Sequence, residues 1–464
     1  MKPSTYKKYV LGVLMVVLAF NYVDRYALGL AQENIKADLH LSDTQLGLLS
    51  GIAFALFYSV VGIPIARWAD RGNRVTIIGL TTALWSAMVA ICGLATSFVQ
   101  LMSIRVGVGV GEAGCIPPAH SLIADLFTRA ERPRAVSIYL QGGSLSVVLG
   151  YFLAGWLNEL YGWRAMFILI GLPGLAMALL TRTTLQEPRL YRSTNIGIGT
   201  RETIASNLSS SAGTSTSEQP SLKEVCRTLW ANKTFRHLLW GHSLLAFFNY
   251  GINNWQPAFF IRSFGLRTGE LGNWLTLAWG ASTLVGIYLG GEWASRHATN
   301  NETLQLRTMA IVNVAFSGGL WALIYLAHSY HVAFALMSIA NLGGTMIYGP
   351  LFATFQTLVS PRMRAISIAI VYLFANLIGL GLGPLAVGAL SDALRPLLAE
   401  ESLRYALLAV CPGYLWVSWH LWQASKTVTG DLASIPTDRD DVAEGALRSE
   451  KRIMTAQTVT RVRS

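Results

Sequence analysis

The stretch Tyr9–Ala31 reads YVLGVLMVVLAFNYVDRYALGLA and carries only two charged residues, Asp24 and Arg25. A helix needs about 20 mostly apolar residues to cross the hydrocarbon core of a bilayer, so this stretch is long enough to span a membrane. A cleavable signal peptide is the alternative, since Lys7 and Lys8 precede the apolar run. No small-residue cleavage site follows, and the two charges interrupt the region where one is expected. We therefore predict an uncleaved first span.

The rest of the chain repeats this pattern. Of the 464 residues 52% are hydrophobic and 13% are charged, whereas about 25% are charged in an ordinary soluble domain. A water-soluble protein is thereby excluded. The apolar stretches predict an all-α membrane protein with twelve transmembrane helices, near 9–31, 44–66, 75–96, 100–126, 135–157, 164–182, 237–261, 270–294, 305–327, 332–358, 366–391 and 403–424.

The positive charge follows the topology. Most of the 36 Lys and Arg residues lie at the N-terminus, in every second loop and in the C-terminal tail. Because cytoplasmic loops are enriched in basic residues, this bias predicts that both termini are cytoplasmic. We expect a multi-pass protein of the cell (inner) membrane. The net charge of +11 is then a signal of orientation, and nucleic acid is not needed as a partner to explain it.

The spans fall into two sets of six. We predict an N-terminal six-helix half over 1–183, a cytoplasmic linker over 184–236, a C-terminal half over 237–425 and a flexible cytoplasmic tail over 426–464. The Ser/Thr-rich part of the linker, 184–221, is interpreted as a flexible tether, with a regulatory role as the alternative. Residues 222–236 regain helical spacing and predict a helix at the membrane surface.

Short motifs recur in the two halves. Arg134-Ala-Val-Ser-Ile returns as Arg364-Ala-Ile-Ser-Ile, and Trp68-Ala-Asp-Arg returns as Trp293-Ala-Ser-Arg. Because each half contains an even number of spans, the repeat is parallel and indicates two pseudo-symmetric halves. Such halves are typical of rocking transporters that hold their substrate between them.

The loop after the second span carries a second kind of motif, Gly62-Ile-Pro-Ile-Ala-Arg-Trp-Ala-Asp-Arg-Gly-Asn-Arg74. It resembles the cytoplasmic signature loop of the major facilitator superfamily. The resemblance implies a cytoplasmic gate formed by Asp70, Arg71 and Arg74, for which Asp125 is the expected partner. The alternative is a turn whose charges are merely solvated. The fifth span lacks the Gly-Pro pair that is common in antiporter branches of this superfamily.

Ionisable residues inside the spans are the candidates for function, because each costs at least about 2.5 kcal/mol at the bilayer centre. Depth at 1.5 Å per residue places Asp24 and Arg105 at one level and Glu112 deeper, near the midplane, with no obvious fixed cation. Glu112 is the first candidate for the proton carrier and Asp24 the second, while Arg105 is an anion ligand or switching partner. The alternative is a static Asp24–Arg105 pair beside a permanently neutral Glu112.

Four motifs of the first half resemble the spinster family of facilitators: Asn21-Tyr-Val-Asp-Arg25, Gly109-Val-Gly-Glu-Ala, Leu122-Ile-Ala-Asp-Leu-Phe127 and Arg134-Ala-Val-Ser-Ile. The resemblance implies coupling and substrate roles for Asp24, Arg25, Arg105 and Glu112, with Asn21 beside them in the first motif. It also implies a lysophospholipid or sphingoid phosphate as substrate. The stretch Gly114-Cys-Ile-Pro-Pro-Ala departs from the family pattern. An Asn-Tyr-x-Asp-Arg first span also occurs in facilitators of small organic anions.

The second half offers uncharged polar and aromatic residues for a substrate. We assign this role to Asn249, Asn253, Tyr348, Phe352 and Asn376. An apolar half that faces a charged half suits an amphipathic anion. Core packing and interfacial anchoring are the plainer explanations for any single aromatic residue.

The sequence shows no phosphate loop, no metal-ligand spacing and no nucleophile–base pair, so we predict no enzyme, no cofactor and no metal site. The predicted function is secondary active transport of an amphipathic lipid-like anion by alternating access, coupled to protons and carried out by a monomer among membrane lipids. A small organic anion, such as a sugar acid or an aromatic acid, is the alternative substrate. A receptor or scaffold without turnover is the alternative from a different class.

Overall fold

The computed structural model describes residues 3–128, 131–188, 222–299, 301–360 and 363–433, and within these residues the regular structure is entirely helical. The first half comprises α1 (Pro3–Leu39), α2 (Asp43–Ser50), α3 (Ile52–Arg71), α4 (Arg74–Cys92), α5 (Phe98–Glu112), α6 (Ile116–Leu126) and α7 (Arg132–Thr184).

A short helix, α10 (Leu222–Ala231), precedes the second half. The second half begins with α11 (Lys233–Phe264), and three of its later helices contain π-helical segments. Its remaining elements are α12 (Thr268–Leu275), η1 (Thr276–Ala281), α13 (Ser282–His297), α14 (Glu302–Val312), η2 (Asn313–Gly319), α15 (Leu320–Leu326), α16 (Tyr330–Thr345), α17 (Tyr348–Thr357), α18 (Arg364–Phe374), η3 (Ala375–Leu382), α19 (Gly383–Leu398), η4 (Ala399–Glu401), α20 (Ser402–Val410) and α21 (Gly413–Ala433).

These described elements make twelve crossings. Eight helical stretches are by themselves long and apolar enough to cross a membrane. Two of the eight hold two crossings each, because Arg134–Thr184 turns at Gly162 and Ile366–Ala433 turns at η4. The left-handed backbone of Gly162, with φ of 76°, is a conformation that residues with side chains rarely adopt. Two further crossings complete the predicted twelve. One is the more polar α11, and the other is formed by α12, η1 and α13 together.

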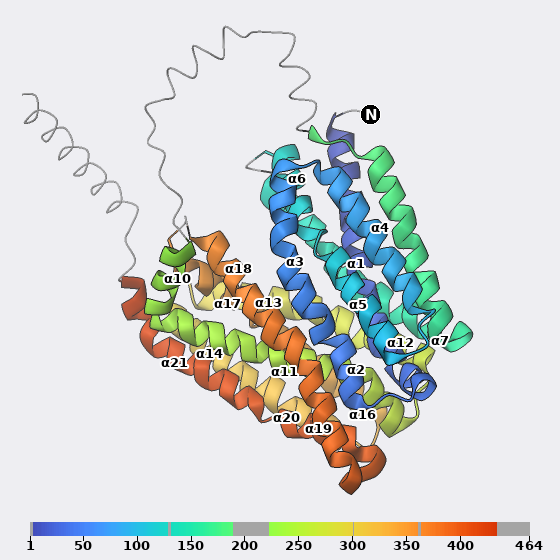
Figure 1. Cartoon of the computed structure of the whole chain (residues 1–464). Helices are drawn as coiled ribbons and strands as arrows, with labels where there is room; N and C mark the ends of the chain where they lie inside the picture. The colour runs from blue at the N-terminus through green and yellow to red at the C-terminus, as the bar shows by residue number, and fades with distance from the viewer. Residues whose placement is uncertain (1–2, 129–130, 189–221, 300, 361–362, 434–464) are drawn as a thin grey trace, which may run out of the picture.

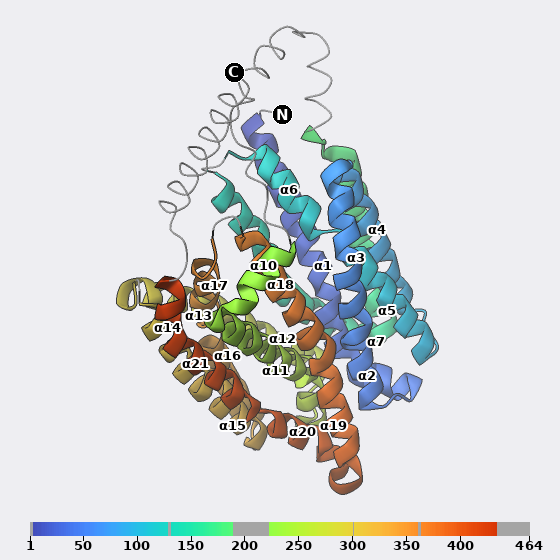
Figure 2. The same cartoon turned by 60° about the vertical axis from the view of Figure 1, so that its left-hand side comes forward.

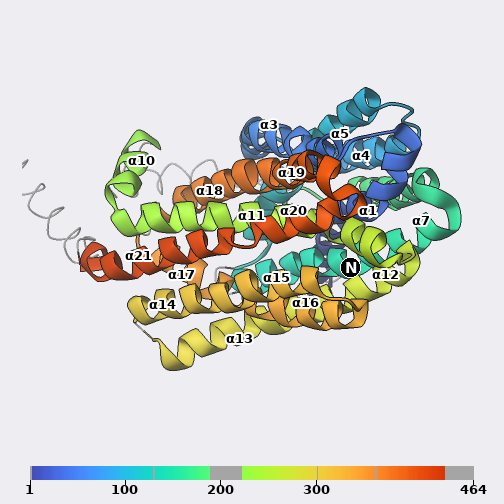
Figure 3. The ribbon, with the colours of Figure 1, turned by 90° about the horizontal axis from the view of Figure 1, so that it is seen from below.

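The two halves meet at one end and diverge toward the other (Figures 1 and 2). Between the halves, α2 packs against α19, α7 against α12, α1 against α11 and α3 against η3. We call the end that carries α2, α12 and α20 the closed end, and the end that carries α6, α10 and α18 the open end. Seen from the closed end, α12 of the second half lies beside α7 of the first half (Figure 3).

Glycines allow the halves to approach closely at the closed end. A Cβ atom on Gly388 of α19 would lie 2.4 Å from the backbone oxygen of Asp43 in α2. A Cβ atom on Gly272 of α12 would lie 2.4 Å from the backbone oxygen of Tyr151 in α7. The two helix pairs are related by the pseudo-symmetry, since each joins the start of the second span of one half to the fifth span of the other. Larger residues at these positions would force the halves apart.

Three predictions at the edges of the halves have different outcomes. Within 222–236 a helix exists as α10, which buries Val225 and Leu229 against the second half and ends at Ala231, while its place at a membrane surface stays a prediction. The tail predicted from 426 onward is wrong for its first part, because α21 continues to Ala433. There Val428 is buried, and Asp431 accepts a hydrogen bond of 2.7 Å from the backbone N–H of Thr234, at the start of α11. The flexible tether predicted over 184–221 is wrong for its first residues, because Leu185 and Glu187 are buried and Glu187 pairs with Arg74. Residues 189–221 and 434–464 lie outside the described residues.

Candidate functional site

The site begins with the close packing of α5. A Cβ atom on Gly111 would lie 2.7 Å from the backbone nitrogen of Trp85 in α4, and one on Gly109 would lie 3.0 Å from the backbone oxygen of Phe54 in α3. Glycines therefore let α5 lie directly against two neighbours. Arg105 and Glu112 occupy the side of α5 that meets α1, where both form ion pairs with α1 residues.

Asp24 of α1 and Arg105 of α5 form a buried ion pair. Nη1 of Arg105 lies 2.5 Å from Oδ2 of Asp24, and both side chains are excluded from solvent. This is the contact that equal membrane depth predicts. Oδ1 of Asp24 and Nε of Arg105 have no hydrogen-bond partner among the described residues. Each member of the pair therefore keeps polar capacity for a further ligand.

Glu112 also has a fixed cation, and the prediction that it lacks one was wrong. Nη2 of Arg25 lies 2.5 Å from Oε2 of Glu112, and Nε of Arg25 donates to the same oxygen at 3.2 Å. The reason is the direction of the side chain, because side chains on a helix point back toward its N-terminus. Arg25 on α1 therefore reaches toward the open end, to the deeper level of Glu112. The other carboxylate oxygen, Oε1, has no partner among the described residues.

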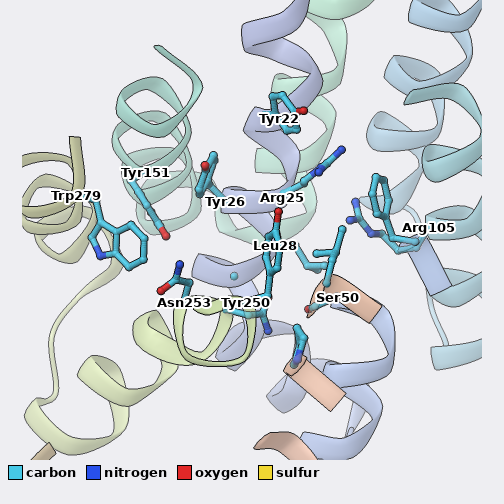
Figure 4. Close-up of a pocket in the computed structure, with 15 residues that line it drawn as sticks. Tyr22, Arg25, Tyr26, Leu28, Ser50, Arg105, Tyr151, Tyr250, Asn253 and Trp279 are labelled. Atoms are coloured by element: carbon cyan, nitrogen blue, oxygen red, sulfur yellow. The ribbon is translucent and has the colours of Figure 1, made fainter. Parts of the chain in front are cut away.

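A cavity of about 180 Å³ lies between the halves, next to these ion pairs. Arg25 and Arg105 line it from the first half, and Asn253 of α11 and Trp279 of η1 line it from the second. In Figure 4, Arg105 lies on one side, Trp279, Tyr151 and Asn253 lie on the other, and Arg25 points into the space between. The remaining lining residues are Tyr22, Tyr26, Leu28, Gly29, Ser50, Phe54, Tyr151, Tyr250, Asn254, Leu380 and Pro384.

The cavity therefore gathers only some of the predicted substrate residues. Arg25, Arg105 and Asn253 line it. Asn21 is fully buried beside it on α1, and neither side-chain amide atom of Asn21 has a partner among the described residues. Asn376 lies half-buried in η3, outside the lining.

Three other predicted residues form a separate cluster in the second half. Asn249 donates to the hydroxyl of Tyr348 at 3.0 Å and accepts from the hydroxyl of Tyr414 at 2.6 Å. The ring of Phe352 packs against His242 and stacks on Tyr372. The side-chain amide of Asn249 and the hydroxyl of Tyr348 therefore form hydrogen bonds within the second half. Their direct contact with a substrate stays a prediction.

Sequence reasoning missed the tyrosines of the lining. Tyr22 and Tyr26 flank the charged residues of the first span, and Tyr250 precedes the asparagines of α11 by one turn. A signal was present, since all three share a helix face or a turn with a predicted site residue. Tyr151 and Trp279 carry no such signal, because only the packing of α7 against η1 brings them to the cavity.

The predicted cytoplasmic gate is a cluster within the first half. The buried guanidinium of Arg74 contacts Asp125 of α6 at 2.7 Å and also pairs with Glu187, which follows α7. The backbone N–H of Arg74 donates to Glu187 at 2.7 Å. Glu187 was not among the predicted gate residues, because nothing in the local sequence links it to the start of α4. Arg71 is exposed, and the side chain of Asp70 lies outside the described part of the structure.

This arrangement predicts a small effect for Asp125→Asn. The Asp125 carboxylate is partly exposed, with 37% of its side-chain surface accessible, so its pairing with Arg74 is screened by solvent. We expect a loss of at most about 1 kcal/mol and a melting temperature lower by about 1–3 °C, measured on purified protein in detergent. Arg71→Gln is the control and should leave melting unchanged. A fall of about 10 °C would show that Asp125, and not Glu187, holds Arg74.

A second charged cluster joins the halves at the closed end. Arg262 of α11 contacts Asp43 of α2 at 2.7 Å and Glu33 of α1 at 2.7 Å. Asp392 of α19 accepts from the backbone N–H groups of Asp43 and Thr44, at 3.1 and 2.7 Å. These contacts cover the closed-end side of the cavity with direct ties between the halves.

Comparison with known proteins shows which family has this architecture. The family model of the Major Facilitator Superfamily matches residues 14–384. An MFS-type efflux pump of Mycolicibacterium smegmatis is 29% identical over 91% of this chain and 93% of its own length. A probable L-galactonate transporter of Escherichia coli is 26% identical over 87% of both chains.

A solved structure gives the same result. The chain superposes on a bacterial homologue of the human lysosomal transporter Spinster, in an inward-facing and unoccupied conformation, with a TM-score of 0.79 and 30% identity. The match covers 93% of this chain and 99% of that one. Twelve crossings, two pseudo-symmetric halves and a cavity between them agree with both comparisons. The chain belongs to the major facilitator superfamily of transporters, which are not enzymes, and within it resembles the spinster type.

Proposed function

We propose that this transporter carries a small organic carboxylate together with a proton. The observation that supports the proposal is the pair of buried ion pairs, Arg25–Glu112 and Arg105–Asp24, beside one cavity. With all four groups charged the set is neutral, and an added anion would be a buried charge without compensation. A proton on Glu112 leaves the set with one positive charge, and Arg25 is then free to bind the carboxylate of a substrate.

The proposal makes proton and anion interdependent. Arg25 cannot pair fully with Glu112 and with a substrate at once, so protonation of Glu112 favours substrate binding. By linkage, substrate binding favours protonation to the same degree. This coupling describes symport, in which a monovalent anion and a proton cross together without net charge. The fifth span lacks the Gly-Pro pair of antiporter branches, so an antiport mechanism has no support from that motif.

The size of the cavity supports a small substrate. A cavity of about 150 Å³ accommodates a benzene molecule, so about 180 Å³ suits an acid with a short chain or one ring. The resemblance to the E. coli protein, a probable L-galactonate transporter, points to the same class. A lipid-like anion is the second candidate, supported by the similarity to the spinster homologue.

The positive-inside bias supports a location in the cell membrane with the open end facing the cytoplasm. The same bias places both termini there. We also propose that a monomer suffices, since the two halves that enclose the cavity are parts of the same chain.

Uptake into proteoliposomes tests the substrate class. We expect galactonate or an aromatic carboxylate to accumulate when the outside is more acidic, and a lysophospholipid to remain unmoved. Uncharged sugars serve as the control and should not accumulate. Movement of the lysophospholipid alone would overturn the small-acid proposal. Accumulation only when the inside is more acidic would replace symport by proton antiport.

A further inference from the structure

We propose that Phe54, with Tyr22 and Tyr58, forms an aromatic cage that positions Arg25 for its ligand whatever the protonation state of Glu112. The guanidinium carbon Cζ of Arg25 lies 4.4 Å from the ring centroid of Tyr22 and 4.4 Å from that of Phe54. The ring of Tyr58 follows at 5.5 Å. All three distances lie within the range of cation–π attraction.

The cage comes from two helices whose local sequence builds it. Tyr22 precedes Arg25 by three residues on α1, and an arginine side chain on a helix points back over the preceding turn. Phe54 and Tyr58 lie one turn apart on α3, and their rings stack with centroids 5.4 Å apart. The backbone at Phe54 rests against Gly109 of α5, where a Cβ atom would come within 3.0 Å of the Phe54 oxygen.

Phe54 also stands between the two cations of the site. Its centroid lies 5.6 Å from Cζ of Arg105 as well as 4.4 Å from Cζ of Arg25, and its side chain is fully buried. One aromatic ring therefore faces both guanidinium groups and reduces the cost of holding two positive charges near each other.

The cage matters for the position of Arg25 when Glu112 is protonated. This role of the cage rests on the proposed function. The carboxylate of Glu112 then no longer attracts Arg25, but the rings still do, because an aromatic ring does not change its charge. Arg25 thus stays at the cavity wall instead of turning to Asp24. Phe54 lines the cavity beside Arg25, carries no proton, and acts through Arg25 as a positioning residue.

Graded fluorination at position 54 tests this role. Fluorine atoms on the ring weaken its attraction for a cation while the ring keeps nearly the same shape, so the variants should fold. In proteoliposomes that take up galactonate or an aromatic carboxylate, we expect KM to rise stepwise with each added fluorine. Phe54→Leu should raise KM about 30-fold, the equivalent of about 2 kcal/mol, and Phe54→Tyr should restore it to within a few-fold.

The accumulation ratio is the second readout. It should remain that of the unmodified protein in all these variants, since the cage orients Arg25 and carries no proton. Phe57→Leu is the matched control, because Phe57 lies on the same helix with its side chain exposed, and we expect its KM unchanged. A KM that does not respond to fluorination overturns the cage. A failure of proton coupling instead changes the accumulation ratio and leaves the graded KM response in place.

Discussion

Glu112→Gln is expected to abolish the accumulation of substrate that an inward proton gradient drives. With the outside more acidic by about 2 pH units, symport of one proton with a monovalent anion accumulates the anion about 100-fold, because each unit is worth about 1.36 kcal/mol. A glutamine at position 112 has no titratable group, so it binds and releases no proton and the accumulation ratio should fall to about one. The measurement is the plateau of labelled substrate in proteoliposomes.

The same variant should still exchange substrate. A neutral amide resembles the protonated acid and leaves Arg25 free, so counterflow without a gradient should persist within a few-fold of the unmodified rate. Glu131→Gln is the control, since Glu131 is an exposed acid at the start of α7, and its ratio should remain about 100-fold. If Glu112→Gln still accumulates substrate fully, Glu112 does not carry the proton. If Asp24→Asn instead removes accumulation with exchange intact, Asp24 is the carrier.

The first-half ion pairs show how far the sequence leads. Spacing and helix rise place Asp24 opposite Arg105, because both helices are long and straight enough for depth to be counted in residues. The Arg25–Glu112 pair escaped that reasoning. A count of residues locates Cα atoms, whereas an arginine side chain extends several ångström along the helix axis, and its direction decided the partner.

Contacts between distant elements were harder to predict. Glu187 follows α7 and meets Arg74 at the start of α4, and no periodicity relates the two positions. The Phe54 cage likewise depends on how closely α3 approaches α5 at Gly109. The glycines of the first half were visible in the sequence, but which neighbour each one admits is a property of the packed bundle.

The closed end provides the second large effect. Arg262→Gln is expected to shift the protein toward a conformation in which the two halves separate at the end that carries α2, α12 and α20. Arg262 of the second half forms ion pairs with Asp43 and Glu33 of the first half. Its own side chain is nearly buried, with 9% of its surface accessible. Removal of one partner from such a desolvated pair between two bodies costs about 2–5 kcal/mol. Within the first half Lys36 still neutralises Asp43 at 2.5 Å, so the loss falls on the contact between the halves.

A spin-label distance across the closed end measures this shift. Tyr161 of α7 and Leu397 of α19 are exposed positions on opposite halves, and Cys226 is the exposed native cysteine to remove before labelling. We expect the population with the longer distance to increase at least about 30-fold relative to the shorter one, as about 2 kcal/mol requires. Arg267→Gln is the matched control. Arg267 also joins the halves, through Glu159 at 2.6 Å, but 77% of its side chain is exposed, so solvent screens the pair. Equal shifts in the two variants would mean that burial of the Arg262 contacts does not set the ratio of the two conformations. If neither variant shifts this ratio, the closed end is held together by the glycine contacts of α2 with α19 and of α7 with α12.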